Sequence, residues 1–248
     1  MKNHTTFAAV TLIVLAVISS CSPIIYSPID DVAPVLDKQG EGEVGMSMSI
    51  PNDFASIFSS GGNPSVQLAA AYSPLSNIGV FGKYNGEIAI DNKIRSGTLG
   101  VGFYQYFEER FLFQAYVIGG RERSQLANLD LDATRYALDF NRNSLGIQPG
   151  IIYINGIVEL GLTCTYKQNW YRNIVLEDIG NPINPIVIPD QQQFLEPALS
   201  LSLIGGPLKL NIKYGQSFLV DDNIFEDNPN AYFSFGVNYV FQQLEKSN

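Results

Sequence analysis

The sequence predicts an all-β fold, an antiparallel up-and-down transmembrane β-barrel of about ten strands that follows a lipidated N-terminal tether. Three observations predict it. Apolar and polar residues alternate along most of the chain, and over 194–215 leucines occupy one face while Glu, Ser and Lys occupy the other. Long connections alternate with short turns, as in membrane barrels. Tyr and Phe gather near the expected strand ends, where such barrels carry aromatic girdles.

The expected strands follow one another as neighbours, each bounded by turn or loop residues. Asn155-Gly156 and Gly205-Gly206-Pro207 predict tight hairpin turns. A polar loop is expected over about 121–134, and a Pro- and Asn-rich loop over about 173–190. The alternation shifts near 141–144, which indicates a bulge or a protruding extension. The strands are expected over about 43–50, 66–72, 78 onward, 96–107, 110–119, 135–154, 158–167, 194–203, 208–214 and 231–241.

The chain begins with an export signal. Lys2 precedes an apolar run over 7–18 that is too short to span a membrane as a helix. Ile18-Ser19-Ser20-Cys21 resembles the bacterial lipobox, so Cys21 is the expected lipidation site, and its acyl chains would anchor the protein in membrane lipid. We expect a lipoprotein signal peptide over 1–20, a lipidated Pro-rich tether over 21–41, the barrel over 42–242 and a polar tail over 243–248. The tether would either space the barrel from its anchor or pack along the barrel wall.

Histidine and cysteine usage excludes most enzyme chemistry. The only histidine, His4, lies in the signal peptide, so the mature chain has no Ser-His-Asp or Cys-His pair and no histidine metal ligand. Cys164 is the only cysteine besides Cys21, and we expect it to be a small apolar strand residue. We predict no enzymatic activity, no catalytic residue, no metal and no cofactor.

The charge balance bears on possible partners. A net charge of −9 argues against nucleic acid, whose binding requires basic patches. Most acidic residues, Asp30 among them, fall in the predicted loops and tether, where we expect water to solvate them. We therefore expect a monomer whose partner is outer-membrane lipid, with any protein partner bound by the extracellular loops.

Alternation alone does not say which face of the barrel points inward. A lipid-anchored, soluble, lipocalin-like binder would place its apolar face inside. The polar face here is rich in Gly, Ala and Ser, which suits a narrow lumen. The last strand ends in Tyr239-Val240-Phe241, which resembles the C-terminal aromatic signal of outer-membrane barrels, although seven residues follow it. We therefore expect the apolar face to meet lipid, and the lipocalin-like binder is the alternative.

In that orientation, charges of both signs line the lumen. Buried charges must pair or find water, and about ten strands leave little room, so we predict a structural or interaction barrel filled by ion-paired side chains. A narrow pore or small-ligand transporter is the alternative, and acid/base chemistry by two carboxylates is disfavoured because lysines lie nearby. We expect a polar cluster around Gln148, Glu159, Thr163 and Glu196, in a lumen that also holds Lys83, Lys167, Lys209 and Lys213.

Two of these residues precede prolines. Gln148-Pro149 and Glu196-Pro197 each direct a polar side chain inward and a proline outward. Because proline cannot donate to the ladder, we expect a bulge or a lost hydrogen bond at each site.

Several segments resemble one known group of proteins. The lipobox, the tether SPIIYSPIDDVAPVLDKQGE and the stretches QLAAAYSPLSNIGVFGKY, GIQPGIIYI and FLEPALSLSL are similar to outer-membrane β-barrel lipoproteins of Bacteroidetes-type bacteria. The resemblance covers most of the mature chain and implies this fold and the cell outer membrane, and no activity. Ser22-Pro23-Ile24 lacks the acidic cluster that resembles a surface-export signal in that group, which favours an anchor on the periplasmic side.

Overall fold

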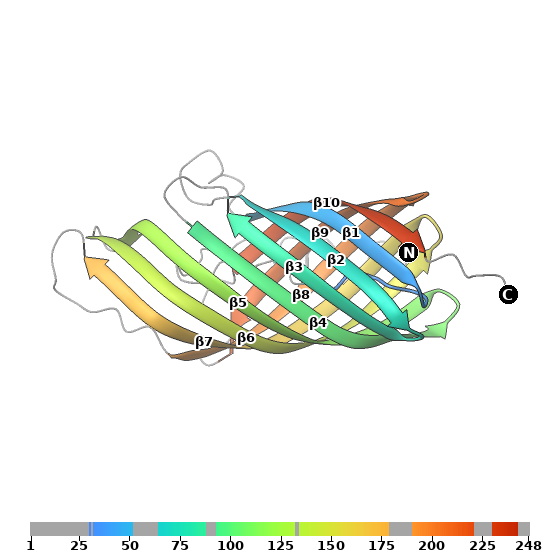
Figure 1. Cartoon of the computed structure of the whole chain (residues 1–248), viewed down its shortest axis with the longest axis horizontal. Coiled ribbons are helices and arrows are strands. Elements are labelled where there is room, and N and C mark those ends of the chain that lie inside the picture. The colour runs from blue at the N-terminus through green and yellow to red at the C-terminus, as the bar shows by residue number, and fades with distance from the viewer. Residues whose placement is uncertain are drawn as a thin grey trace, which may run out of the picture.

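The chain forms one closed antiparallel β-barrel (Figure 1). The computed structural model describes residues 30, 32–51, 64–87, 93–131, 134–178, 190–220 and 230–242. Each strand pairs with its neighbours in the chain, and β1 pairs with β10 to close the sheet, so the predicted barrel of about ten strands is confirmed. The strands are β1 (Glu41–Pro51), β2 (Ser65–Leu75), β3 (Ile78–Glu87), β4 (Lys93–Glu108), β5 (Phe111–Leu131), β6 (Thr134–Asn155), β7 (Val158–Asp178), β8 (Gln191–Gly205), β9 (Leu208–Leu219) and β10 (Asn230–Gln242).

Four two-residue turns lie at one end of the barrel, together with the start of β1 and the end of β10 (Figure 1). Asn77, Gly156 and Gly206 have positive φ in three of these turns, a conformation that Gly and Asn tolerate best. We name this the short-turn end and the opposite one the long-loop end. In bacterial outer-membrane barrels the short turns face the periplasm.

Two strands, β5 and β7, extend further toward the long-loop end than the sequence pattern predicts. β5 continues to Leu131 and β6 begins at Thr134, so the predicted loop over 121–134 is wrong (Figure 1). β7 likewise continues to Asp178, into the second predicted loop. Polar residues follow one another over 121–125, and polar and apolar residues come in runs over 168–178, so these extensions lack the period-two contrast that marks a strand facing lipid. The pairing of β6 with β7 shifts between Asp139 and Asn141, next to the predicted irregularity.

The two strand prolines interrupt the ladder without shifting it. Pairing of β6 with β7 skips Pro149, pairing of β8 with β9 skips Pro197, and both ladders resume in the same register. A lost hydrogen bond, rather than a bulge, therefore accommodates each proline.

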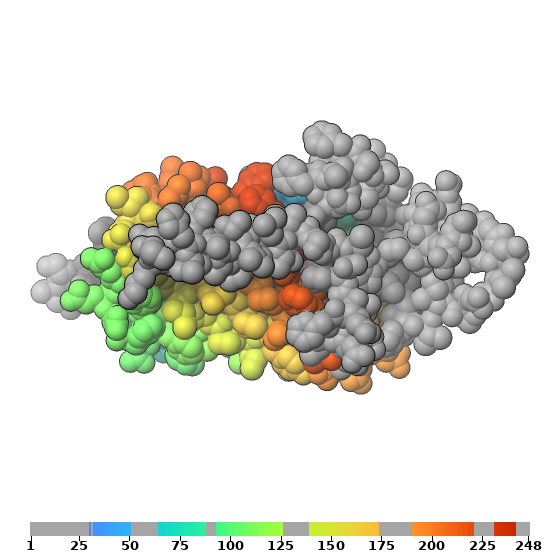
Figure 2. All heavy atoms as spheres, turned by 180° about the vertical axis from the view of Figure 1, so that it is seen from behind, coloured from blue at the N-terminus to red at the C-terminus, as the bar shows by residue number. Residues whose placement is uncertain are grey.

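The two faces of the wall differ in chemistry. Large apolar side chains point outward and are exposed, Leu99 to 72% and Met46 to 58%, whereas the inward side chains are mostly polar or charged and buried. Seen from behind, the wall is a continuous surface of side chains where grey atoms leave it in view (Figure 2). An apolar exterior is favourable in lipid and unfavourable in water, so the lipocalin-like alternative does not fit. Among the described residues, no helix has the length and apolar character needed to cross a membrane.

The described part of the N-terminal tether lies inside the barrel. We name residue 30 together with residues 32–40 the plug segment. Its C-terminal end lies at the short-turn end, where the Gly40 amide donates to the Ser73 carbonyl at 2.8 Å. From there, going back along the chain toward Asp30, the segment follows β3 from the level of Gly79 to that of Lys83. The tether, expected to space the barrel from its anchor or to pack along its wall, therefore occupies the lumen over its described part. Its Ala33 and Leu36 belong to a buried apolar cluster with Ala71, Phe81, Tyr104, Leu112, Tyr116, Ile118 and Ile152.

Candidate functional site

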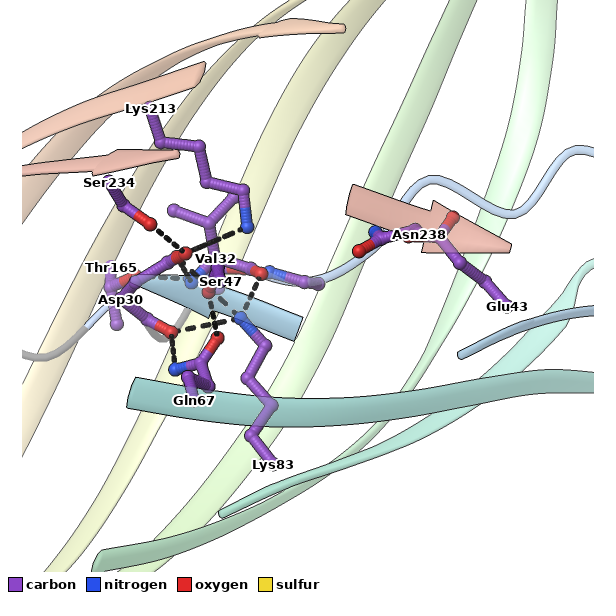
Figure 3. A network of polar contacts seen from close by, with 12 residues as sticks. Asp30, Val32, Glu43, Ser47, Gln67, Lys83, Thr165, Lys213, Ser234 and Asn238 are labelled. Atoms are coloured by element: carbon purple, nitrogen blue, oxygen red, sulfur yellow. Dashed lines mark hydrogen bonds and ion pairs between the residues drawn. The ribbon is translucent and has the colours of Figure 1, made fainter. Parts of the chain in front are cut away.

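Asp30 is the centre of the polar network in the lumen (Figure 3). Its carboxylate has no exposed surface and accepts hydrogen bonds from Lys213 Nζ at 3.0 Å and Ser234 Oγ at 3.2 Å. Lys83 Nζ lies 3.6 Å from its other oxygen as an ion pair. One buried carboxylate is thus placed between two ammonium groups from opposite parts of the wall, which satisfies the requirement that buried charges be paired.

The wall also holds the main chain of the plug segment. Lys83 Nζ donates to the Asp30 carbonyl at 2.9 Å and to the Val32 carbonyl at 2.6 Å. Gln67 Nε2 donates to the same Asp30 carbonyl at 2.7 Å (Figure 3). These contacts satisfy backbone groups that would otherwise be buried without partners in a segment that has no ladder of its own.

Nearer the short-turn end, one polar link and one apolar contact fix the segment. The Ala33 amide donates to Gln148 Oε1 at 2.7 Å, and Gln148 Nε2 donates to Thr165 Oγ1 at 2.6 Å. Leu36 is fully buried in the apolar cluster, against the wall where Tyr116 also lies. Polar contacts therefore set the position of the segment while apolar burial adds stability.

Lys209 forms ion pairs with two carboxylates, closer to the short-turn end than the Asp30 network. Its Nζ lies 3.2 Å from Glu43 Oε2 and 2.8 Å from Glu159 Oε2, and Asn238 donates to the other oxygen of Glu43. The Glu159 contact is an ion pair without a well-directed hydrogen bond to that oxygen. The lysine side chain is only 3% exposed, so removing it would leave two carboxylates poorly compensated.

Two further ion pairs line the wall outside these networks. Lys167 Nζ lies 2.9 Å from Glu196 Oε2, and Ser217 donates to the other oxygen of Glu196 at 2.7 Å. Toward the long-loop end, Arg142 donates to Glu122 at 2.6 Å. Both pairs are buried, and each bridges neighbouring strands, β7 with β8 and β5 with β6.

The plug segment leaves little free volume beside it. The cavity between the segment and the wall formed by β1, β2, β3, β8, β9 and β10 measures about 40 Å³. That is space for a few water molecules and not for a substrate. Along its described part, the lumen is filled rather than open.

The predicted lumen residues all point inward, but they do not form one cluster. Gln148 contacts the plug segment, Glu159 pairs with Lys209 and Glu196 pairs with Lys167. The Thr163 hydroxyl is buried without a hydrogen-bond partner among the described residues. The remaining two predicted lysines, Lys83 and Lys213, both pair with Asp30.

The sequence predicts that water solvates Asp30, and this prediction is wrong because the residue is fully buried in the lumen. Its wall partners lie 37 to 204 residues away in the chain, so no local pattern connects them. The one available signal is charge balance. Alternation directs four lysines into the lumen but only three glutamates, Glu43, Glu159 and Glu196, and an excess of buried cations requires further anions.

Among the described residues, the lumen carboxylates are arranged as ion pairs with lysines or an arginine. Glu159 and Glu196 each bind a lysine of their own, so they do not act as an acid/base pair across one substrate position. Within the described ranges, no group of three His, Cys, Asp or Glu residues could hold a metal ion. Cys164 is half-buried in β7, as expected of a strand residue, whereas Cys21 lies outside the described residues.

Comparison with solved structures places the fold. The barrel is similar to the outer-membrane protease OmpT from Escherichia coli, with 9% identity, 84% of this chain and 99% of that chain covered, and a TM-score of 0.51. The fold is that of outer-membrane β-barrels. At this identity the likeness extends to the fold alone. No family model and no curated protein sequence matches the chain.

Weaker structural likenesses are of the same kind. The KdgM porin shares 10% identity over 81% of this chain and 99% of its own, with a TM-score of 0.39. The translocator domain of the autotransporter NalP from Neisseria meningitidis shares 10% identity over 82% of this chain and 90% of its own, with a TM-score of 0.44.

Proposed function

We propose that this protein is an outer-membrane lipoprotein whose barrel is closed by its own N-terminal segment and serves a structural or interaction role. The observation that carries the proposal is the position of Asp30, which is fully buried and held by Lys83 and Lys213 in the lumen. A barrel built for steady conduction would not fill its lumen with a segment whose carboxylate is ion-paired and whose main chain is hydrogen-bonded to the wall. The extended strands β5, β6 and β7 then provide a surface for a partner beyond the membrane.

Planar-bilayer recording of the mature chain tests the closed state. We expect the wild-type protein to give no steady conductance. The double variant Asp30→Ala/Leu36→Ser should conduct, because it loses both the ionic and the apolar attachment of the plug segment. Gln39→Ala is the matched control, since Gln39 lies in the same segment but is exposed. Steady conductance of the wild-type protein would contradict the proposed closed role.

A second candidate function is a gated narrow pore. It is favoured by the polar character of the wall behind the plug segment, where Ser, Thr, Asn and Gln face the lumen beside the lysines. Displacement of the segment would leave a narrow polar passage of the kind that a ten-stranded barrel can form. This candidate predicts that some condition opens the wild-type protein reversibly, and voltage ramps during the same recordings would detect such openings.

Lipidation of Cys21 is the second part of the proposal, and the lipobox supports it. Mass spectrometry of the mature N-terminal peptide should find an acylated cysteine, and this modification should be missing from Cys21→Ser. The Cys21→Ser protein should stay in the membrane fraction after alkaline extraction, because the apolar wall spans the bilayer without the anchor. Release of this variant as a water-soluble protein would contradict the membrane-spanning barrel.

The periplasmic side of the anchor is a prediction from the residues after Cys21. Nine Cα-to-Cα steps join Cys21 to Asp30, which allows a reach of about 30 Å at most, so the anchor must lie close to one end of the lumen. An epitope placed directly after Cys21 should be inaccessible to antibody on intact cells and accessible after the outer membrane is opened. Labelling of intact cells would place the anchor on the outer surface instead.

A further inference from the structure

A group of arginines lies on the outer wall just beyond the apolar belt. On β4 the outward side chains run from Val101 and Leu99 through Gly97 to Arg95, and on β5 Arg121 and Arg123 are exposed on the same face. All three arginines lie on the long-loop side of the apolar residues. Guanidinium groups at this height meet the headgroup layer of the outer leaflet when the belt is in lipid.

The arginines are neighbours across the sheet. Arg95 lies directly opposite Arg123, and Arg123 in turn lies opposite Asn141, which pairs with Arg172 on β7. Arg121 lies opposite Gly97, one outward position closer to the belt. Like charges directly opposite on antiparallel strands repel each other, because their Cβ atoms are only about 5 Å apart. Such a row needs a counter-ion.

Protein carboxylates do not supply this counter-ion within the described part of the chain. No ion pair joins a described carboxylate to Arg95, Arg121 or Arg123. Asp139 lies opposite Gln125, which is two residues beyond Arg123 on β5. Asp139 accepts a hydrogen bond from the Gln125 side chain at 3.0 Å. The contrast with the lumen is clear, because there every predicted lysine has a carboxylate.

Below the arginines the wall is hollowed. Gly97 and Gly119 face outward and carry no side chain, and the hollow is bordered by Leu99, Val117 and Arg121. An acyl chain could lie along this apolar wall while its headgroup reached the guanidinium groups. Arginine binds phosphate through paired, charge-assisted hydrogen bonds, which makes phosphate the anion best matched to this row.

We propose that the outer wall of β4 and β5 binds a phosphate-bearing lipid of the outer leaflet, with Arg95, Arg121 and Arg123 at the phosphate and the hollow at Gly97 and Gly119 along an acyl chain. The inference requires only the membrane-spanning barrel and is independent of whether the lumen is closed. The site would hold a structural lipid at the point where the extended strands leave the bilayer.

Native mass spectrometry of the purified full-length barrel in detergent tests this site, with diphosphorylated lipid A as the probe. We expect Arg95→Gln/Arg123→Gln to weaken binding about tenfold or more, since each arginine near an anionic lipid surface contributes on the order of a fivefold effect. Arg110→Gln is the matched control. Arg110 is an exposed arginine in a turn at the short-turn end, where its guanidinium donates to Tyr153 at 3.4 Å, and this variant should bind as the wild type does.

Two further probes separate the sources of binding. Dephosphorylated lipid A should bind poorly, and inorganic phosphate should compete only weakly because it lacks the acyl chain. Equal affinity of the wild type and Arg95→Gln/Arg123→Gln would overturn the proposal, as would equal loss in Arg110→Gln. Tight binding of inorganic phosphate alone would show an anion site without a lipid, and equal binding of the dephosphorylated lipid would show apolar adsorption only.

Discussion

Lys209 shows how much the lumen depends on single charges, because one ammonium group compensates both Glu43 and Glu159. Replacing it with methionine keeps most of the volume but leaves two buried carboxylates without their cation. We expect Lys209→Met to lower the free energy of unfolding by about 3–5 kcal/mol. The triple variant Lys209→Met/Glu43→Gln/Glu159→Gln should recover most of that loss. Heat-dependent loss of β-sheet circular dichroism in micelles measures both, and equal melting of the two variants would contradict the charge argument.

Asp30 gives the plug a dependence on pH. Burial favours the neutral acid, but Lys213 and Lys83, with hydrogen bonds from Lys213 and Ser234, hold the pKa of the Asp30 carboxyl below its ordinary value of 3.8. A carboxyl with a lowered folded pKa stabilises the plugged state above its ordinary pKa, and this stabilisation is lost as pH falls through the folded pKa.

Conductance should therefore appear in the wild-type protein only in strong acid, below pH ~4. Asp30→Asn should already conduct at pH 7, and it should lack the acid-dependent step. The lumen also holds the ion pairs of Glu43, Glu159 and Glu196, and the asparagine variant controls for them because it keeps all three. An acid step of the same size in Asp30→Asn would assign the pH dependence to those pairs instead.

At the scale of elements, the fit of β4 against β5 sets the space for the plug segment. A Cβ added at Gly102 would overlap the Ala115 carbonyl oxygen and lie 2.7 Å from Tyr116 Cα, and neither of these backbone atoms can move freely. We expect Gly102→Ala to destabilise the barrel by about 1–3 kcal/mol. Gly86→Ala is the control in β3, because nothing lies within 4 Å of a Cβ there. Reversible urea unfolding of the two variants in lipid vesicles would measure the difference between their free energies of unfolding. Similar free energies of unfolding would contradict the packing argument.

The same scale shows what a sequence can predict. The strands that cross the belt are predictable because lipid on one side and a polar lumen on the other force strict alternation. The contrast between the two faces ends where the wall leaves lipid. The sequence therefore predicts loops for the outer parts of β5 and β7, although their backbones continue the hydrogen-bonded ladder. The inward direction of the lumen lysines follows from alternation alone, whereas their partners do not. Asp30 lies outside every strand, and only the closed barrel brings Lys83, Lys213 and Ser234 around it.

At the scale of the whole molecule, the plug segment both neutralises the lumen and blocks it, and these two effects can be separated. Deletion of residues 22–40 removes Asp30 and leaves Lys83 and Lys213 without that carboxylate. We expect the truncated barrel to melt at a lower temperature and to conduct, because buried cations that lose a partner are strongly destabilising.

Methionine at both lysine positions should then restore part of the melting temperature of the truncated barrel without closing it. In the full-length chain the same Lys83→Met/Lys213→Met pair should destabilise, because Asp30 would be buried without a cation. The change of sign between the two backgrounds is the expected result, and a double-mutant cycle of melting temperatures measures it. If the lysine substitutions had the same effect in both, the plug would be held by its apolar contacts, with Leu36 rather than Asp30 as its main attachment.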